Sequence, residues 1–454
     1  MEALEKKTRD MTSGPVLPQI LSFMIPVLLG NLFQQFYNVV DAMIVGRLLG
    51  AKALAAVGST TSVQFLVLGF CMGSCAGFGI PVSQKFGAKQ ANLMRRYIYH
   101  SAVVTMIIAC TLTLLTCCMC GKIIDIMRTP ADIERDAYQY LLIIFIGIPF
   151  TLLYNLTASI LRSVGNSRIP FIFLAVSTIL NIFLDLFCVA VLNLGCAGAA
   201  IATVMSQALS GLGCLFYILG TMKEILPDRK ECKWSTDIAK NLLLMGLPMG
   251  FQYSITAIGS MVMQSANNSL GSVYVSAFTA GTKVKQLMLC PFDSIATAMA
   301  TFVGQNVGAR NMDRIKSGIR QTLFAAIAYS AFAFVVMTFF GKPLAALFVS
   351  VDNSDVIDAA ASYMAALGAF YWLLAILIVF RYAIQAIGFS MLSVISGILE
   401  MLARSLVSTI FVPMFGYTAI CFTDQSAWIA ATIFLVFMLH RLLRKIAVDF
   451  TAKT

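Results

Sequence analysis

The chain has 454 residues, of which 59% are hydrophobic and only 12% are charged. Soluble domains carry about 25% charged residues, so this composition excludes a water-soluble shell around a core of this size. The formal net charge of +11 would suit a nucleic-acid-binding protein, but in so apolar a chain the placement of the charges matters more than their sum. We therefore expect a membrane protein with lipid around it and no nucleic-acid partner.

Twelve apolar segments follow one another along the chain, and each is long enough to cross a bilayer. They should be helices, because lipid offers the backbone no hydrogen-bond partner. The loops between them are short, so we expect no soluble domain. The predicted spans are 17–45, 53–83, 97–120, 137–161, 169–192, 197–222, 239–267, 273–303, 318–341, 361–387, 389–412 and 418–440.

The basic residues predict how these spans are oriented. Of the 32 Lys and Arg residues, 22 fall in one set of loops and tails, 6 fall in the opposite set and 4 lie within spans. Loops rich in Lys and Arg remain in the cytoplasm. Both termini are therefore expected on the cytoplasmic side of a plasma membrane.

The first span contains a stripe of polar side chains and a proline. Asp41 follows Gln34, Tyr37 and Asn38 at helical spacing, so the four side chains share one face and should line a cavity rather than contact lipid. Pro26 interrupts the same span and should kink it. The kink could serve as a hinge or could be static, and the sequence leaves both readings open.

An internal repeat relates the two halves of the chain. Gly50–Gln90 aligns without a gap on Gly271–Asn311, 221 residues later, with ten identities in forty-one positions. Six spans per half is an even number, so the halves share one orientation and are related by an axis along the membrane normal. We predict lobes at 1–222 and 239–454, joined by a cytoplasmic linker at 223–238.

The fifth and sixth spans add a second carboxylate and two neutral oxygen ligands. Asp185 lies one turn after Asn181, and Thr203 follows a run of small residues that would let two helices approach closely. A charged side chain within a span costs at least about 2.5 kcal/mol, so Asp41 and Asp185 suggest a function. Together these four residues suit a proton or a hard cation such as sodium. The alternative is that the acids only hydrogen-bond neighbouring helices.

The second half carries its buried charges differently. Glu400 and Arg404 are four residues apart on one helix, which favours a structural ion pair over a functional carboxylate. Lys285 and Asp293 share one helix face and invite the same interpretation.

Motifs of enzymes and metal sites are missing from the sequence. Cys117, Cys118 and Cys120 form a Cys-x-x-Cys pattern without a second ligand pair, and there is no Walker A loop, HExxH or GxSxG. We expect no metal, no cofactor and no enzymatic activity. A membrane-embedded enzyme is disfavoured because the acids lack histidine or metal-motif partners, and a channel is disfavoured by the two-lobed repeat.

Over nearly its full length the chain resembles the multidrug and toxic compound extrusion (MATE) transporters. The matching segments are Pro26 through Asn31-x-x-Gln34-x-x-Tyr37-x-x-x-Asp41, Val45-Gly46-Arg47-Leu48-Leu49-Gly50, Ser83-Gln84-x-x-Gly87-Ala88, Leu161-Arg162-x-x-Gly165-Asn166-Ser167, Asn181-x-x-x-Asp185 and Phe302-Val303-Gly304-Gln305-Asn306-x-Gly308-Ala309. The resemblance implies two six-helix lobes in a V shape. It also implies export of amphipathic, often cationic compounds in exchange for protons or sodium.

The resemblance also assigns roles to residues. The residues that match the N-lobe cation site of the DinF-like branch are Asp41, Asn181, Asp185 and Thr203. Those that match positions near its drug cavity are Gln34, Tyr37 and Asn155. The C-lobe acids of another branch are missing here. We expect a bacterial, monomeric transporter of small amphipathic molecules, and a flippase or exporter of a lipid-linked saccharide or metabolite is the alternative.

Overall fold

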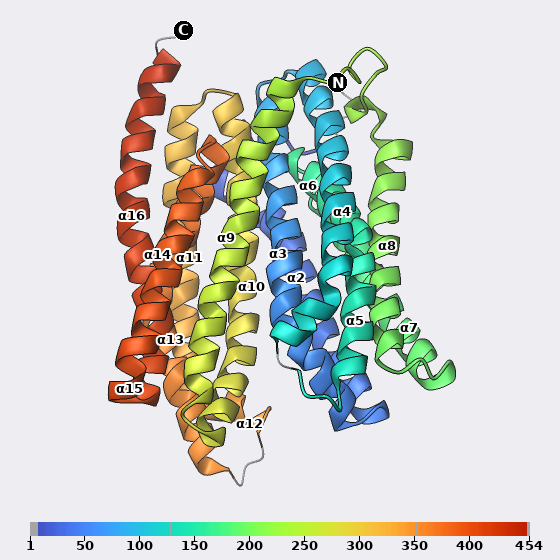
Figure 1. Ribbon diagram of the computed structural model, residues 1–454. Coiled ribbons are helices and arrows are strands. Elements are labelled where there is room, and N and C mark those ends of the chain that lie inside the picture. Colours follow the sequence, from blue (N-terminus) through green and yellow to red (C-terminus); the bar gives the residue numbers. More distant parts are fainter. Residues whose placement is uncertain (1–7, 128, 350–352, 452–454) are drawn as a thin grey trace. The chain divides into compact units, whose positions relative to one another are not determined.

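The computed structural model describes residues 8–127, 129–349 and 353–451, which form helices and turns with no strand among them (Figure 1). Eleven helices of this part are long and apolar enough to cross a membrane. The count is twelve if the bent pair α5 (Glu134–Ile146) and α6 (Ile148–Ser163) forms one span. The predicted all-α polytopic fold is confirmed.

The chain divides into two compact units. Unit 1 contains Ile25–Gly250 and the described residues up to Asp10, and unit 2 contains Met11–Met24 and the residues from Phe251 onward. The two divisions fall inside α2 (Val16–Leu48), next to Pro26, and inside α9 (Thr236–Asn268), next to Pro248. The predicted linker 223–238 therefore lies within unit 1, and the start of the first span belongs to unit 2.

The start of α9 belongs to unit 1 because it packs closely against α3. A Cβ atom on Gly77 would lie 2.6 Å from the Cα atom of Gly246, and one on Gly250 would lie 2.4 Å from the Ser74 hydroxyl. Only glycine permits such an approach of two helix backbones. The linker before α9 is held as well, because Arg95 forms a salt bridge of 2.7 Å with Glu231. This hydrogen-bonded partner lowers the pKa of Glu231.

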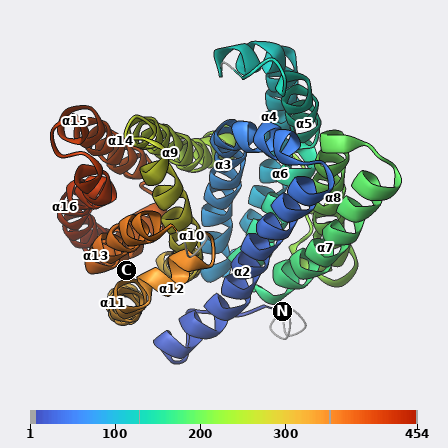
Figure 2. The ribbon, with the colours of Figure 1, turned by 90° about the horizontal axis from the view of Figure 1, so that it is seen from below.

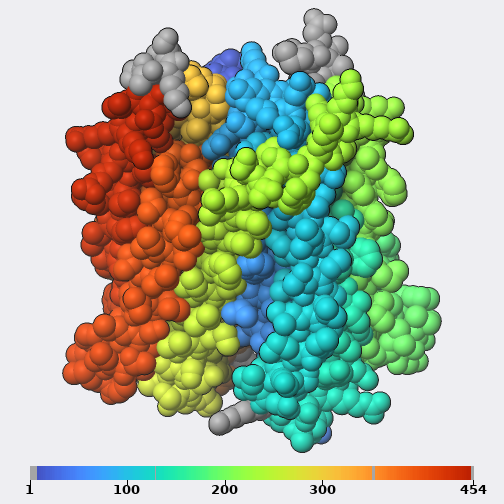
Figure 3. Space-filling model, turned by 45° about the horizontal axis from the view of Figure 1, so that its top comes forward, coloured from blue at the N-terminus to red at the C-terminus, as the bar shows by residue number. Residues whose placement is uncertain are grey.

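The remaining helices of unit 1 pack around α6 and α8, as the view from below shows (Figure 2). Their outer surface is apolar: α4 covers one face (Figure 3) and exposes large side chains such as Met106 and Leu114. Such a surface suits contact with lipid. The remaining elements of unit 1 are α3 (Ala51–Gly87), α4 (Ala91–Ile126), α7 (Arg168–Leu186), the π-helix η1 (Phe187–Val191), α8 (Gly195–Thr221) and the 3-10 helix η2 (Lys223–Ile225).

The predicted span 137–161 is bent by 44° between α5 and α6, at Gly147. The bend has a tertiary cause, because a Cβ atom on Gly147 would lie 2.3 Å from the side chain of Val204 on α8. It also has a local one, because Pro149 in the first turn of α6 has no N–H to donate to the preceding helix. Hydropathy alone predicts a straight helix there.

In unit 2, α13 lies at the centre and contacts α10, α11 and α16. The elements of unit 2 besides α9 are α10 (Ser272–Gly308), α11 (Met312–Phe339), α12 (Gly341–Ala346), α13 (Ser354–Ile387), α14 (Met391–Leu406), the π-helix η3 (Val407–Phe411), α15 (Val412–Phe415) and α16 (Tyr417–Thr451).

The backbone repeats the sequence duplication. Helices α3 and α10 both have 37 residues, and each follows a glycine with positive φ, 87° at Gly50 and 104° at Gly271. Each is followed by a basic residue in the left-handed region, Lys89 at 56° and Arg310 at 55°. A non-glycine residue rarely adopts that conformation, so the shared geometry is specific. Further matched pairs are Gly165 with Gly388, Gly195 with Gly416, and η1 with η3.

Candidate cation site

The predicted coupling residues come from three helices of unit 1. Asp41 lies on α2, Asn181 and Asp185 lie on α7, and Thr203 lies on α8. Helices α2 and α7 are in contact, because the ring of Phe33 on α2 packs edge to face against the ring of Phe171 on α7, with centroids 6.0 Å apart.

The two carboxyl groups are neighbours. Asp41 and Asp185 lie close enough to repel each other when both are ionised. Tyr37, one turn before Asp41, lies near both acids and places its hydroxyl beside Thr203. Tyr140 from α5 lies near the same group. The structure therefore brings together two carboxylates and three hydroxyl groups.

Many polar atoms of this group have no partner in the part of the chain that the structure describes. They are Oδ1 of Asp41, both carboxylate oxygens of Asp185, both amide atoms of Asn181 and the hydroxyl of Thr203. Asp185 and Asn181 are fully buried. Among the described residues no Lys or Arg forms a salt bridge with either acid. An unpartnered buried polar atom costs about 1–3 kcal/mol, so a bound proton or cation would stabilise this set.

The local backbone around Asp185 is unusual. The π-helix η1 begins two residues after Asp185, and such segments occur frequently at functional sites. A Cβ atom on Gly198 would lie 3.1 Å from the backbone carbonyl of Cys188 in η1. The small residues at the start of α8 thus allow this helix to approach η1.

Among the described residues, no hydrogen bond or ion pair joins the other predicted cavity residues to this group. Gln34 is half-buried and Asn38 is exposed on α2. Asn155 donates a hydrogen bond of 2.8 Å to the carbonyl of Thr151 on its own helix. Their place near a drug cavity stays a prediction. No group of three His, Cys, Asp or Glu side chains in the described part of the chain could hold a metal ion.

Unit 2 holds a buried network of charges. Arg404 lies 3.7 Å from Glu400 and 3.0 Å from Asp424, and Arg381 forms a second ion pair with Glu400. Lys285 pairs with Asp424 on α16, not with Asp293 as the sequence pattern suggested. Sequence reasoning missed Asp424, Arg381 and Tyr140.

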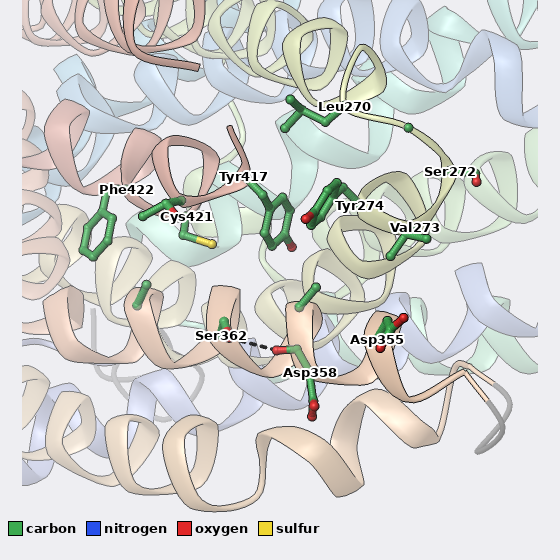
Figure 4. A pocket seen from close by; sticks show the side chains of 14 residues that line it. Leu270, Ser272, Val273, Tyr274, Asp355, Asp358, Ser362, Tyr417, Cys421 and Phe422 are labelled. Atoms are coloured by element: carbon green, nitrogen blue, oxygen red, sulfur yellow. Dashed lines mark hydrogen bonds between the residues drawn. The ribbon is translucent and has the colours of Figure 1, made fainter. Parts of the chain in front are cut away.

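A cavity of about 1020 Å³ also lies in unit 2, where α10, α13 and α16 begin (Figure 4). The rings of Tyr274 and Tyr417 stack beside it with centroids 4.6 Å apart, and Asp355 and Asp358 of α13 line it. None of the lining residues belongs to the predicted site.

The model of the MatE family matches residues 26–187 and 248–417, and these residues make up more than half of the chain. The chain belongs to the MatE family. It is a transporter and not an enzyme, because MatE is a family of transporters. The sequence resemblance to MATE proteins is thereby confirmed, whereas its assignment to the DinF-like branch stays a prediction.

Curated relatives of this MatE protein are bacterial. A probable multidrug resistance protein, YpnP of Bacillus subtilis, is 29% identical over 93% of this chain and 91% of its own. An FAD transporter of Shewanella oneidensis is 25% identical over 84% of each chain.

Solved structures share the fold. A MOP superfamily transporter from Pyrococcus furiosus superposes with a TM-score of 0.88 at 21% identity, covering 98% of both chains. A multidrug resistance MATE family transporter in an outward-facing conformation gives 0.87 at 21% identity, covering all of this chain and 98% of its own.

Proposed function

We propose that this protein is a secondary active antiporter that exports amphipathic, cationic compounds in exchange for protons or sodium. Membership of the MatE family supports transport, and relatives named as multidrug resistance or multidrug export proteins support the substrate class. The single observation that supports the coupling role is that two neighbouring acids, the buried Asp185 and the half-buried Asp41, have no basic partner among the described residues.

Coupling follows from competition for this negative charge. A bound proton or sodium ion neutralises the acids, and a cationic substrate that binds beside them would favour release of that ion. Such coupling is reciprocal, so the ion entering from outside would release the substrate in turn. Asn181 and Thr203 would add neutral ligands to the ion. Tyr37 lies beside both acids and would connect the ion to the substrate.

We propose that Gln34, Tyr37, Asn38 and Asn155 line the substrate cavity. The transporter would act as a monomer in the plasma membrane, with both termini in the cytoplasm. A second candidate is export of a metabolite or a lipid-linked saccharide, and it is favoured by the relative named as an FAD transporter. Proteoliposomes loaded with FAD or with a fluorescent organic cation separate these two substrate classes.

The decisive experiment measures efflux of that cation from proteoliposomes under pH and sodium gradients imposed separately. Asp41→Asn and Asp185→Asn should each abolish ion-driven efflux and leave thermal unfolding unchanged or shifted upward, because each removes a charge that is costly to bury. Asn181→Ala and Thr203→Ala should weaken apparent ion affinity about fivefold, which corresponds to one neutral ligand of ~1 kcal/mol.

Asp293→Asn is the matched control. Asp293 is another acid within a span, on α10, and it has no salt bridge among the described residues. It should retain coupling. Wild-type coupling in both unit 1 variants, or a loss confined to Asp293→Asn, would place the coupling site in unit 2 and refute the proposal.

A further inference from the structure

The matched glycines of the two units extend the internal repeat to residues of the unit 1 site and of the unit 2 charge network. Thr203 and Asp424 each lie eight residues after the positive-φ glycines Gly195 and Gly416. The same comparison, made from Gly165 and Gly388, pairs Asn181 with Arg404 and Tyr140 with Tyr363. Made from Gly50 and Gly271, it pairs Gln64 with Lys285. Asp424, Arg404 and Tyr363 are thus the counterparts of residues of the unit 1 site, and Lys285 is the counterpart of Gln64 on α3.

Asp424 is the centre of the unit 2 network. It is 2% exposed and accepts from three side chains: Lys285, Arg404 at 3.0 Å and the hydroxyl of Tyr363 at 3.4 Å. Its carboxylate therefore occupies the position of the Thr203 hydroxyl, with a tyrosine beside it as in unit 1. Glu400, one turn before Arg404, adds the second carboxylate.

The two units differ in what faces their acids. In unit 1 the acids have no basic partner among the described residues, and the residues that match Arg404 and Lys285 are the neutral amides Asn181 and Gln64. In unit 2 these two positions hold the cations Arg404 and Lys285, both within reach of Asp424. With Arg381, unit 2 has three cations against two carboxylates and needs no further positive charge.

We propose that the charge network of unit 2 is the counterpart of the unit 1 cation site, and that the side chains of Lys285 and Arg404 occupy the place of the cation. Coupling cations therefore exchange through unit 1 alone. A tethered cation acts at an effective concentration far above that of a free ion, which therefore cannot displace it. Only the claim that cations exchange through unit 1 rests on the proposed function. If Lys285 and Arg404 were replaced, the site opened in unit 2 would bind a small monovalent cation.

The proposal predicts that a cation site can be opened in unit 2 by introducing the residues of unit 1. Lys285→Gln with Arg404→Asn leaves Arg381 against Glu400 and Asp424, a net charge of −1 in a buried place. Such an uncompensated charge is strongly destabilising unless an ion joins it. Lys283→Gln with Arg404→Asn is the matched control. Lys283 is exposed on the same helix, and this pair retains Lys285, so the network becomes neutral instead of negative.

The test uses full-length protein carrying Asp41→Asn and Asp185→Asn, so that unit 1 contributes no response. Melting temperature is measured at constant ionic strength in sodium, lithium, methylammonium or choline chloride. The opened variant should melt roughly 1–2 °C higher in at least one of the three small cations at tenfold excess over its dissociation constant than in choline. The control should show no difference, and adding Asp424→Asn to the opened variant should remove the response.

A folded variant without any cation-specific shift, or a shift that survives Asp424→Asn, would overturn the proposal. If the opened variant is recovered folded only when one of the three cations is present, that requirement supports it. Failure to fold in all three counts against it. The protein that carries only Asp41→Asn and Asp185→Asn should show no cation-dependent change in melting temperature. Such a change would refute the proposed site of unit 1, and the comparison of the opened variant with its control would remain valid.

Discussion

Arg314 on α11 holds the segment that precedes the first helix. Its guanidinium donates to the carbonyls of Met11 at 2.9 Å, Gly14 at 2.6 Å and Ser13 at 2.9 Å, and to the side-chain oxygen of Gln19 at 2.7 Å. The amide N–H of the buried Met11 also donates to the side-chain oxygen of Gln305 at 2.8 Å. A planar group with several fixed donors suits this arrangement, which a lysine cannot reproduce.

Arg314→Ala should therefore lower the free energy of unfolding by about 2 kcal/mol, because hydrogen bonds to a charged group are lost together. Arg314→Lys should recover only a small part of this. Thermal unfolding in detergent measures both effects. Lys316→Ala, an exposed cation on the same helix, is the control. Equal melting temperatures for Arg314→Ala and Lys316→Ala would mean that these bonds contribute nothing.

From the sequence, individual site residues could be predicted only where an acid lies within an otherwise apolar span. Asp41 and Asp185 were found in this way, and the structure brings them together. Asp424 escaped notice although it is as deeply buried, because its partners Lys285 and Arg404 come from other helices. Spacing along one helix cannot reveal such pairs, and it led to Asp293 as a partner of Lys285. The repeat register, followed as far as Gly416, would have pointed to Asp424.

At the scale of elements, the two helices that both units share, α2 and α9, each contain a proline within two residues of the division. The division of α2 falls between Met24 and Ile25, and Pro26 follows at once. A proline has no N–H to donate and weakens the helix at this point. A kink at Pro26 would therefore lie where the chain passes from one unit to the other, and we expect it to act as a hinge.

Pro26→Ala should slow transport severalfold and raise stability, since proline is about 3 kcal/mol less favourable than alanine within a helix. Efflux rates and thermal unfolding report the two effects separately. Pro291→Ala in α10, a helix wholly within unit 2, is the control and should leave the transport rate unchanged. Full transport by a stabilised Pro26→Ala protein would show that the kink is static.

Helix existence was predictable from hydropathy, whereas bends and π-helices were not. The repeat predicted that the helices after Gly50 and Gly271 correspond, and both contain 37 residues. The break at Gly147 depends on Val204, more than fifty residues later, and on the nearby Pro149, and a hydropathy pattern registers neither of them. Likewise η1 and η3 lie inside apolar runs that read as continuous helices.

At the scale of the whole molecule, the distribution of charge predicts the orientation in the membrane. The linker between the predicted lobes contains an exposed native cysteine, Cys232, next to Lys230 and Lys233. A membrane-impermeant maleimide should label Cys232 in inside-out vesicles and not in intact cells, because loops rich in Lys and Arg remain in the cytoplasm.

Mass spectrometry of the labelled peptide identifies the site, and Cys232→Ser should lose the signal. Labelling of Cys232 in intact cells would reverse the predicted topology.

The bond between Arg314 and Met11 also has a consequence for the order in which the protein is made. The two residues are 303 positions apart. At 5–20 residues per second the first helix must wait roughly 15–60 s after synthesis before its partner leaves the ribosome. The start of α9, in contrast, finds Gly77 and Ser74 of α3 already made. Insertion therefore begins before Met11 has its partner, and this bond can form only in the second half of translation.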